Sequence, residues 1–271
     1  MQEFSVLMSL YIKEKASNFE ECMQSMLKQT VLPTECVVVL DGPISEELRQ
    51  ALESYQAQYG DWIVVVPLEV NHGLGLALAE GVRHCKYDLI ARMDTDDIAR
   101  SDRFEKQLAC FEKDPDLSIC GSHIIEFEGS IDHVLAKRKV PLTHDAIAAY
   151  QKQRSAFNHM TVMFTKEAIL KAGNYQHAPL MEDDLMWVHM LQSGAKCLNI
   201  DDYLVYARTG YEMICRRGGW SYFKKYRKGR RQILETGYIS YWDYWKTVAI
   251  QAVVALVPQS VRFFIFNKLL R

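Results

Sequence analysis

The sequence predicts an α/β protein in which a mostly parallel sheet lies between two layers of helices, and three observations support this prediction. Short apolar runs alternate with segments of helical periodicity, and the connections between them are short. The composition, 49% apolar and 24% charged, is that of a globular chain rather than a disordered one. Its 271 residues allow one large domain or two modest ones, with a sizeable core.

The alternation is clearest in the first hundred residues. Four short apolar runs, each bounded by turn residues, predict buried strands at 4–10, 35–40, 62–66 and 87–93. Apolar residues three and four apart predict the helices between them: one that follows a Ser17-x-x-Glu20 capping box, one at 46–59 and one at 75–85. This order of strands and helices is typical of a parallel sheet.

Beyond residue 100 the alternation weakens. Strands are expected at 117–127 and 161–164, and helices at 168–171 and 183–191. No Pro- or Gly-rich linker divides the chain. We therefore expect one domain over 1–210, with halves of about 1–100 and 101–210, followed by a basic, aromatic and helical C-terminal appendage over 211–271.

Cysteine usage and the lack of targeting signals predict a cytoplasmic protein. The seven cysteines form no C-x-x-C pair, which argues against a zinc site and against a secreted disulfide framework. The N-terminus has no basic region before its apolar run, so no signal peptide is expected. No run of eighteen apolar residues predicts a membrane-spanning helix.

The C-terminal region is strongly basic although the whole chain has a formal net charge of −2. Residues 216–271 contain twelve Lys or Arg but only Glu235 and Asp243, which predicts an anionic partner unless the cations simply face solvent. Cations and aromatic rings over 224–245, next to the apolar stretch 248–257, are typical of a segment in the headgroup region of a membrane. A packed C-terminal helix is the alternative. No RNP, KH or zinc-knuckle pattern accompanies the cations, so no nucleic-acid partner is expected.

Polar residues follow three of the predicted strands at the ends that parallel strands share. They are Tyr11, Asp41 and the acidic run Asp94-Thr95-Asp96-Asp97. Ligands of open α/β sheets bind outside the carboxyl ends of the strands. We therefore expect these side chains to converge on one crevice.

The acidic run is a candidate metal site. Three carboxylates in four residues repel one another unless a cation neutralises them, and oxygen ligands favour Mg²⁺ or Mn²⁺. The alternative is a solvated acidic turn that caps the next helix. Ile98 and Ala99 exclude an EF-hand, and Leu78 stands where a dinucleotide-binding motif needs its third glycine. No P-loop lysine follows a Gly-rich turn.

The neighbours of the acidic run make its interpretation more specific. An ordered set of motifs runs along nearly the whole chain: Ser5-Val-Leu-Met-Ser-Leu-Tyr11, Val37-Val-Val-Leu-Asp-Gly42, Asn71-His-Gly-Leu-Gly75, Tyr87-Asp-Leu-Ile-Ala-Arg-Met-Asp-Thr-Asp-Asp97 with Arg103 and Gln107, Asn158-His-Met-Thr-Val-Met163, Gly173-Asn-Tyr175, Glu182-Asp183 with Trp187, and Asn199-Ile200. This set resembles the family 2 inverting glycosyltransferases, enzymes of GT-A fold.

The resemblance implies a nucleotide-sugar site in the first half of the chain. Asp96, helped by Asp97 and with Asp94 near the ribose and diphosphate, would hold Mn²⁺ or Mg²⁺ against the phosphates of the leaving group. Asp41 would hydrogen-bond the uracil, and Arg92 would support the acidic run. The full set of residues implied for the UDP-sugar donor is Tyr11, Asp41, Asn71, Gly73, Arg92, Asp94 and Thr95.

The resemblance also implies a catalytic base in the second half. Asp183 would take a proton from the acceptor hydroxyl as it attacks the anomeric carbon, a single displacement that inverts the configuration. Many relatives read Glu-Asp-Tyr-Asp-Leu-Trp, whereas this chain reads Glu182-Asp-Asp-Leu-Met-Trp187. Asp184 is therefore the other candidate base, and Glu182 belongs to the same group. Without the resemblance, the three acids would be interpreted as favourable charges at a helix N-terminus.

A second motif concerns the acceptor. The stretch Arg216-Arg-Gly-Gly-Trp220 resembles a subfamily of O-antigen and capsule glycosyltransferases whose acceptors are sugars on a polyprenyl diphosphate. Arginine binds phosphate oxygens bidentately, and glycines let the backbone approach a ligand closely. The implied acceptor or diphosphate site comprises Arg216, Arg217, Gly218, Gly219, Trp220 and His159. The alternative is a basic surface turn with Trp220 as a core anchor.

The resemblances together imply an enzyme at the cytoplasmic face of the inner membrane, peripherally associated with it. It would move a hexose in β-linkage, with UDP-galactose as donor, onto a lipid-diphosphate-linked amino sugar in O-antigen, capsule or lipopolysaccharide synthesis. Glucose, N-acetylhexosamine and rhamnose are alternative donor sugars. A sugar-phosphate nucleotidyltransferase would need a Gly-rich, lysine-bearing signature near the N-terminus, which is absent. A non-catalytic membrane adaptor would need neither Asp96 nor Asp183.

Overall fold

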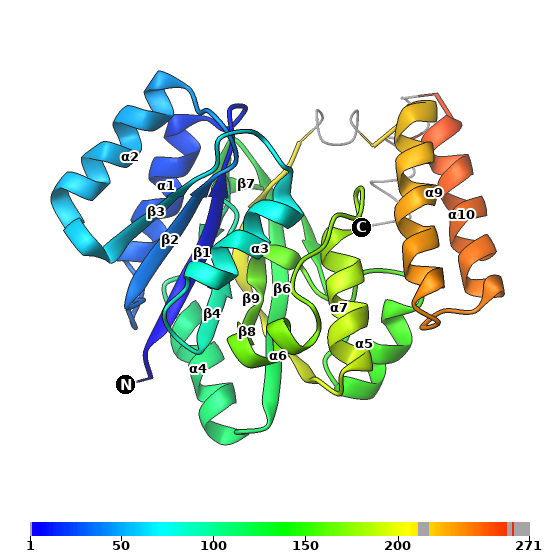
Figure 1. Cartoon of the computed structure of the whole chain (residues 1–271). Helices are drawn as coiled ribbons and strands as arrows, with labels where there is room; N and C mark the ends of the chain where they lie inside the picture. The colour runs from blue at the N-terminus through cyan, green and yellow to red at the C-terminus, as the bar shows by residue number, and fades with distance from the viewer. Residues whose placement is uncertain (1, 211–216, 259–261, 263–271) are drawn as a thin grey trace.

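The computed structural model describes residues 2–210, 217–258 and 262, and within these ranges the chain forms a nine-stranded sheet with helices on both faces (Figure 1). The order of strands in the sheet is β3-β2-β1-β4-β8-β6-β9-β5, with β7 paired to β6. The strands are β1 Phe4–Leu10, β2 Glu35–Leu40, β3 Ile63–Pro67, β4 Leu89–Arg92, β5 Ile98–Ala99, β6 Leu117–Glu128, β7 Ser130–Arg138, β8 Met163–Thr165 and β9 Lys196–Arg208. The expected three-layer α/β arrangement is confirmed.

Helices cover both faces of this sheet, and two more follow at the C-terminal end. The helices are α1 Ala16–Leu27, α2 Glu46–Tyr59, α3 Leu74–His84, α4 Arg103–Lys113, α5 His144–Gln151, α6 Lys166–Lys171, α7 Glu182–Gln192, α9 Gly219–Glu235 and α10 Tyr241–Leu256. Short 3-10 turns lie at Gly60–Trp62 and His159–Thr161.

Two apolar clusters hold the layers together. Successive side chains of a strand point to opposite faces. Val6 of β1 therefore belongs to the cluster that contains Phe19 of α1, and the adjacent Leu7 belongs to the cluster that contains Leu78 and Trp187. Because both faces are covered, the central parallel strands are nearly continuous apolar runs.

The parallel pairing brings three strand ends to one side of the sheet. In β1, Leu10 pairs with Leu40 of β2, and Leu7 pairs with Arg92 of β4. Beyond the strands the backbone bonding continues, since the amide of Asp41 donates to the Leu10 carbonyl over 2.8 Å. The residues that follow β1, β2 and β4 therefore emerge at a common end, which is where the candidate site lies.

The structure corrects one local prediction and adds elements that the periodicity did not reveal. The Ser17-x-x-Glu20 capping box is wrong, because α1 begins at Ala16 after Lys15 and has no side-chain cap. Neither β7, α5 nor β9 was expected as an element. In β9 the pairing with β6 skips Asp201 and Asp202 between two register positions, and this bulge breaks the apolar pattern.

The C-terminal helices α9 and α10 form a hairpin that packs against α7 (Figure 1). Their shared apolar cluster contains Leu185 of α7, Phe223 of α9 and Val248 of α10. Part of the apolar stretch 248–257 is thus buried in protein, including Val254. Over the described residues, no helix combines the length and the apolarity that crossing a bilayer requires.

We expect Gly81→Val to lower the free energy of unfolding by about 1–3 kcal/mol, although valine has the higher helix propensity. Gly81 lies on the buried side of α3, where a Cβ would meet Leu7 and would lie 2.8 Å from Val39 Cγ2. Urea unfolding followed by circular dichroism measures the change. The control is Leu76→Val on the exposed side of α3, expected to change stability by less than about 1 kcal/mol. Equal stability of Gly81→Val and the unmodified protein would contradict this packing.

Candidate active site

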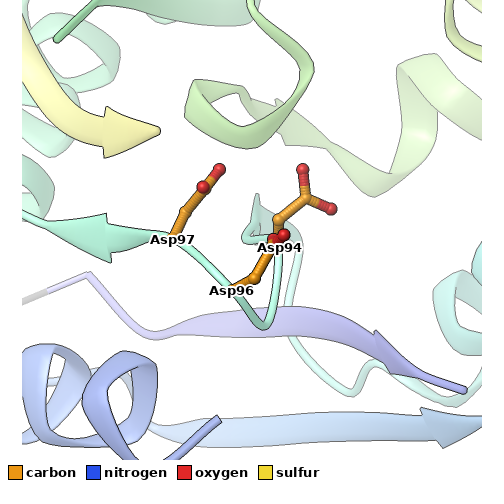
Figure 2. A group of neighbouring side chains, drawn as sticks. All are labelled: Asp94, Asp96 and Asp97. Atoms are coloured by element: carbon orange, nitrogen blue, oxygen red, sulfur yellow. The ribbon is translucent and has the colours of Figure 1, made fainter. Parts of the chain in front are cut away.

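Three aspartates form a compact acidic cluster in the turn that follows β4. Asp94, Asp96 and Asp97 each offer one carboxylate oxygen within 4.8 Å of the others. Figure 2 shows the three side chains on a single turn, with those of Asp94 and Asp97 directed the same way out of it. The hydroxyl of the buried Thr95 bonds back to the Ser9 carbonyl of β1, which ties the turn to the sheet.

The cluster carries more acid than its surroundings neutralise. Burial, together with the charges of Asp94 and Glu14, raises the pKa of Asp96 to about 7. Burial and the neighbouring Asp96 and Asp94 raise the pKa of Asp97 well above its usual value. Asp97 Oδ1 accepts from the Arg208 amide at 2.7 Å, whereas Oδ2 has no hydrogen-bond partner among the described residues. Buried, unpaired carboxylate oxygens fit a hard divalent cation.

A buried arginine lies beside the acidic cluster and forms a hydrogen bond to it. Arg92 ends β4, is 1% exposed, and donates from Nη2 to Asp94 Oδ1. Its Nε and Nη1 have no hydrogen-bond partner in the part of the chain that the structure describes. Arg103 of α4 donates to the Arg92 carbonyl at 2.8 Å and to Gln107 Oε1 at 2.9 Å, so hydrogen bonds from α4 fix the end of β4.

A residue missed in the sequence also holds the acidic turn. Arg208, at the end of β9, donates from Nε to the Asp96 carbonyl at 2.9 Å and bonds with Glu21 of α1. Its amide donates to Asp97. The strand that carries Arg208 was not expected. The motif Asn199-Ile200, near the start of β9, was the sequence signal that pointed to this strand.

Asp41 organises the loop before α3. Its carboxylate accepts from the His72 amide at 2.7 Å, the Gly73 amide at 3.0 Å and Asn71 Nδ2 at 2.9 Å. Gly73 has φ +88° just before α3, a conformation that favours glycine. Asp41, Asn71 and Gly73 are therefore brought together. The Asp41 carboxylate stabilises the conformation of the loop, in addition to any contact that it makes with a ligand.

The second acidic group begins α7. Burial and the charges of Asp184 and Glu182 raise the pKa of Asp183 to about 8. Asp184 Oδ1 accepts from Gln151 Nε2 of α5 at 2.7 Å, so this carboxylate is held against the protein. A Cβ on Gly75, in the first turn of α3, would lie 2.9 Å from Glu182 Cβ, which shows how closely the starts of α3 and α7 approach.

A buried tyrosine connects the two acidic groups. Burial raises the pKa of Tyr175, with Arg92 opposing and Asp183 and Asp94 adding to the rise. Both carboxylates therefore act electrostatically on the same phenol. The Tyr175 hydroxyl and His159 Nε2 are 2.8 Å apart, and burial with Arg92 nearby lowers the pKa of that imidazole well below its usual value. The His159 imidazole beside Tyr175 is therefore neutral. Tyr175 itself was missed as a site residue.

The predicted acceptor motif is only partly described. Arg216 lies outside the described residues. A Cβ on Gly218 would meet the guanidinium of Arg262, so this glycine accommodates a side chain of the same protein. Gly219 starts α9 with φ +85°. Trp220 is 55% exposed and lies 5.6 Å from Lys224 Nζ, so the alternative of a core anchor is wrong.

Comparison with known proteins decides the family. Residues 5–173, more than half of the chain, match glycosyl transferase family 2. The chain belongs to this family. The matched range includes the acidic turn after β4, whereas the acids at the start of α7 lie beyond its end.

Two curated relatives match almost end to end. The amylovoran biosynthesis glycosyltransferase AmsE of Erwinia amylovora is 38% identical over 98% of this chain and 98% of its own length. The UDP-Gal:alpha-D-GlcNAc-diphosphoundecaprenol beta-1,3-galactosyltransferase of Escherichia coli is 37% identical over 99% of this chain and 97% of its own length.

Solved structures support the same GT-A fold. The mannosyltransferase PcManGT from Pyrobaculum calidifontis, in complex with GDP-Man and Mn²⁺, has a TM-score of 0.65 at 15% identity and covers 97% of this chain and 78% of its own. S. aureus TarS 1–349 in complex with UDP-GlcNAc has a TM-score of 0.63 at 17% identity, covering 96% of this chain and 69% of its own.

We expect Asp96→Asn to weaken Mn²⁺ binding in the presence of UDP by at least about tenfold, because it removes one negative charge from the acidic cluster. Electron paramagnetic resonance of free Mn²⁺ measures binding without reference to catalysis. Asp88→Asn, at the opposite end of β4, is the matched control and should leave the affinity unchanged. Equal Mn²⁺ affinity in the two variants would remove Asp96 from the metal site.

We expect Asp183→Asn to lower kcat by about 10²–10⁴-fold with little change in KM for the donor, as loss of a general base does. Asp184→Asn should retain most activity. In the unmodified enzyme the rate should rise with pH with a midpoint near 8, because Asp183 can act as a base only when it is ionised. Asp184→Asn removes a neighbouring negative charge, so the pKa of Asp183 falls and the rise moves to lower pH. Initial rates as a function of pH test this, and the reverse ranking of the variants would make Asp184 the base.

Proposed function

We propose that this family 2 glycosyltransferase is a metal-dependent, inverting hexosyltransferase that moves galactose from UDP-galactose in β-linkage onto an amino sugar carried by a polyprenyl diphosphate. The observation that carries the substrate assignment is the near-complete alignment with the Escherichia coli galactosyltransferase. The similarity to the Erwinia amylovora protein supports a place in O-antigen or capsule polysaccharide assembly.

On the donor side, the acidic cluster would hold Mn²⁺ or Mg²⁺. When bound, the ion supplies Lewis-acid stabilisation of UDP as the leaving group. Tyr11 and the loop ordered by Asp41 would bind the nucleoside, with Asn71 and Gly73 supporting that loop. Arg92 would keep Asp94 directed toward the cluster, and this role is supported by its burial and its bond to Asp94.

On the acceptor side, Asp183 would remove the proton from the attacking hydroxyl. The acceptor oxygen bonds to the anomeric carbon, the bond from that carbon to the diphosphate oxygen breaks, and the proton ends on the Asp183 carboxylate. Attack from the face opposite UDP inverts the configuration at that carbon. The raised pKa of Asp183, about 8, supports this assignment because a general base is most effective with a pKa near the working pH.

The lipid-linked acceptor would bring the enzyme to the cytoplasmic face of the inner membrane as a peripheral protein. In this proposal residues 1–100 bind the donor, 101–210 shape the acceptor site, and 211–271 meet the membrane. Arg216 and Arg217, with Gly218, Gly219 and Trp220, would bind a diphosphate, and His159 would line the acceptor side.

A donor screen tests the proposal. With a synthetic N-acetylglucosaminyl diphosphate lipid as acceptor, we expect UDP-galactose to exceed UDP-glucose, UDP-N-acetylglucosamine and dTDP-rhamnose by at least about tenfold in kcat/KM. Because the displacement inverts the anomeric centre, the product should be β-linked by proton NMR. EDTA should abolish transfer, and added Mn²⁺ should restore it. An α-linked product would contradict inversion, and a preference for another donor would replace galactose.

A further inference from the structure

The outward side of α10 carries an exposed apolar stripe. Trp242, Trp245, Val253 and Leu256 recur at helical spacing on one side of the helix, and each is between 52% and 77% exposed. Tyr244, Thr247, Val248, Val254 and Ala255 form the opposite, buried side. The helix is therefore apolar on both sides, and the four residues of its outer stripe are exposed.

A basic groove lies beside this stripe. Cations of α9 and aromatic rings of α10 line a space of about 980 Å³: Lys224, Arg227, Lys228 and Arg231 from α9, and Tyr241, Tyr244 and Trp245 from α10. Glu235 is the one carboxylate among the described lining residues, and it pairs with Arg231 at 3.0 Å. The groove therefore keeps a net positive charge, and Trp245 belongs to both the groove and the stripe.

We propose that this face of the hairpin, the basic groove together with the α10 stripe, is a docking surface for an anionic phospholipid bilayer. The inference rests on the proposed function, because a lipid-linked acceptor needs an enzyme at the bilayer surface. Cations attract anionic headgroups, tryptophan and tyrosine prefer the interface, and the aliphatic stripe reaches the upper acyl region. The charge of the groove favours this occupant over a second copy of the same basic hairpin, which would repel it.

The inner side of α9 supports the candidate base. A Cβ on Gly229 would lie 2.6 Å from both the Pro179 carbonyl oxygen and Met181 Cγ, which directly precede α7. The buried Arg230 donates from Nε to Thr247 Oγ1 of α10 at 3.0 Å, which locks the two helices together on this side. Helix α9 thus contacts the residues before α7, the helix of Asp183, on its inner side and carries part of the proposed docking surface on its outer side.

This arrangement sets the height of the base above the bilayer. A helix with its side chains is about 10 Å across, so a hairpin lying on the membrane would keep the start of α7 about that distance from the headgroups. A sugar attached through a diphosphate to a lipid extends a comparable distance from the bilayer. The docking surface would therefore deliver the acceptor hydroxyl to Asp183 without withdrawing the lipid from the membrane.

Vesicle binding by the full-length chain tests the docking surface. The probes are phosphatidylcholine vesicles with and without phosphatidylglycerol, and sedimentation measures bound protein. We expect Arg227→Glu/Lys228→Glu and Trp242→Glu/Trp245→Glu each to weaken binding to the anionic vesicles by at least about tenfold. The matched control is Lys171→Glu/Lys225→Glu, which makes the same charge change at exposed positions outside the groove and should bind normally. Higher salt should weaken binding by the unmodified protein.

Two activity measurements separate this surface from the transferase chemistry. Both groove and stripe variants should keep full activity on a water-soluble, short-chain acceptor and should lose activity on an acceptor embedded in anionic vesicles. Unchanged vesicle binding in both variants would overturn the docking surface. So would a dimer that Trp242→Glu/Trp245→Glu dissociates while vesicle binding persists, because the stripe would then be a contact between copies. Variant-sensitive vesicle binding without transfer from any donor would support the surface and overturn the proposed function.

Discussion

The site depends on one buried positive charge placed between two groups of acids. Arg92 carries this charge at the end of β4, where burial opposes it and Asp94 compensates it. Its charge also acts on Asp96, Asp97 and Glu182, where it opposes the rise in pKa that burial and the neighbouring carboxylates cause. Without this cation, the low-dielectric interior would have to accommodate carboxylates with no fixed partner, which is costly in free energy.

The surrounding fold serves to keep that cation in place. The guanidinium of Arg103 bonds the Arg92 carbonyl, and Gln107, which Arg103 also contacts, donates to the Thr161 carbonyl at 2.8 Å. These bonds link α4 to the end of β4 and to the turn before β8. Burial and the like charge of Arg92 lower the pKa of Arg103 to about 9, so both effects disfavour the charged form of the residue that supports Arg92.

The sequence was informative where local pattern and burial agree. Strands 4–10 and 35–40 and the helix 46–59 match the structure residue for residue, because each is a short apolar run or an amphipathic helix bounded by turn residues. The acidic turn was predicted from its composition as a candidate metal site, and the structure brings its three carboxylates together. Arg208 and Gln151 could not be predicted as site residues, since their positions in the site come from long-range packing of elements with weak periodicity. Tyr175 belongs to the motif Gly173-Asn-Tyr175, but its contact with His159 comes from the same long-range packing. The bulge in β9 shows why: its aspartates bind Arg100, Lys106 and His123 rather than following an alternation.

Gly218 belongs to the predicted acceptor motif, but packing within the protein also requires a glycine at this position. Arg262 donates to the carbonyls of Val254, Ala255 and Val257, satisfying the open C-terminal end of α10. The same guanidinium occupies the space where a Cβ at position 218 would stand. Any larger residue there would displace the arginine and leave those carbonyls unsatisfied at the far end of the partner helix. Gly218 thus leaves room for Arg262 to cap the C-terminal end of α10 beside the start of α9. Its small size is required whether or not a lipid-linked sugar binds.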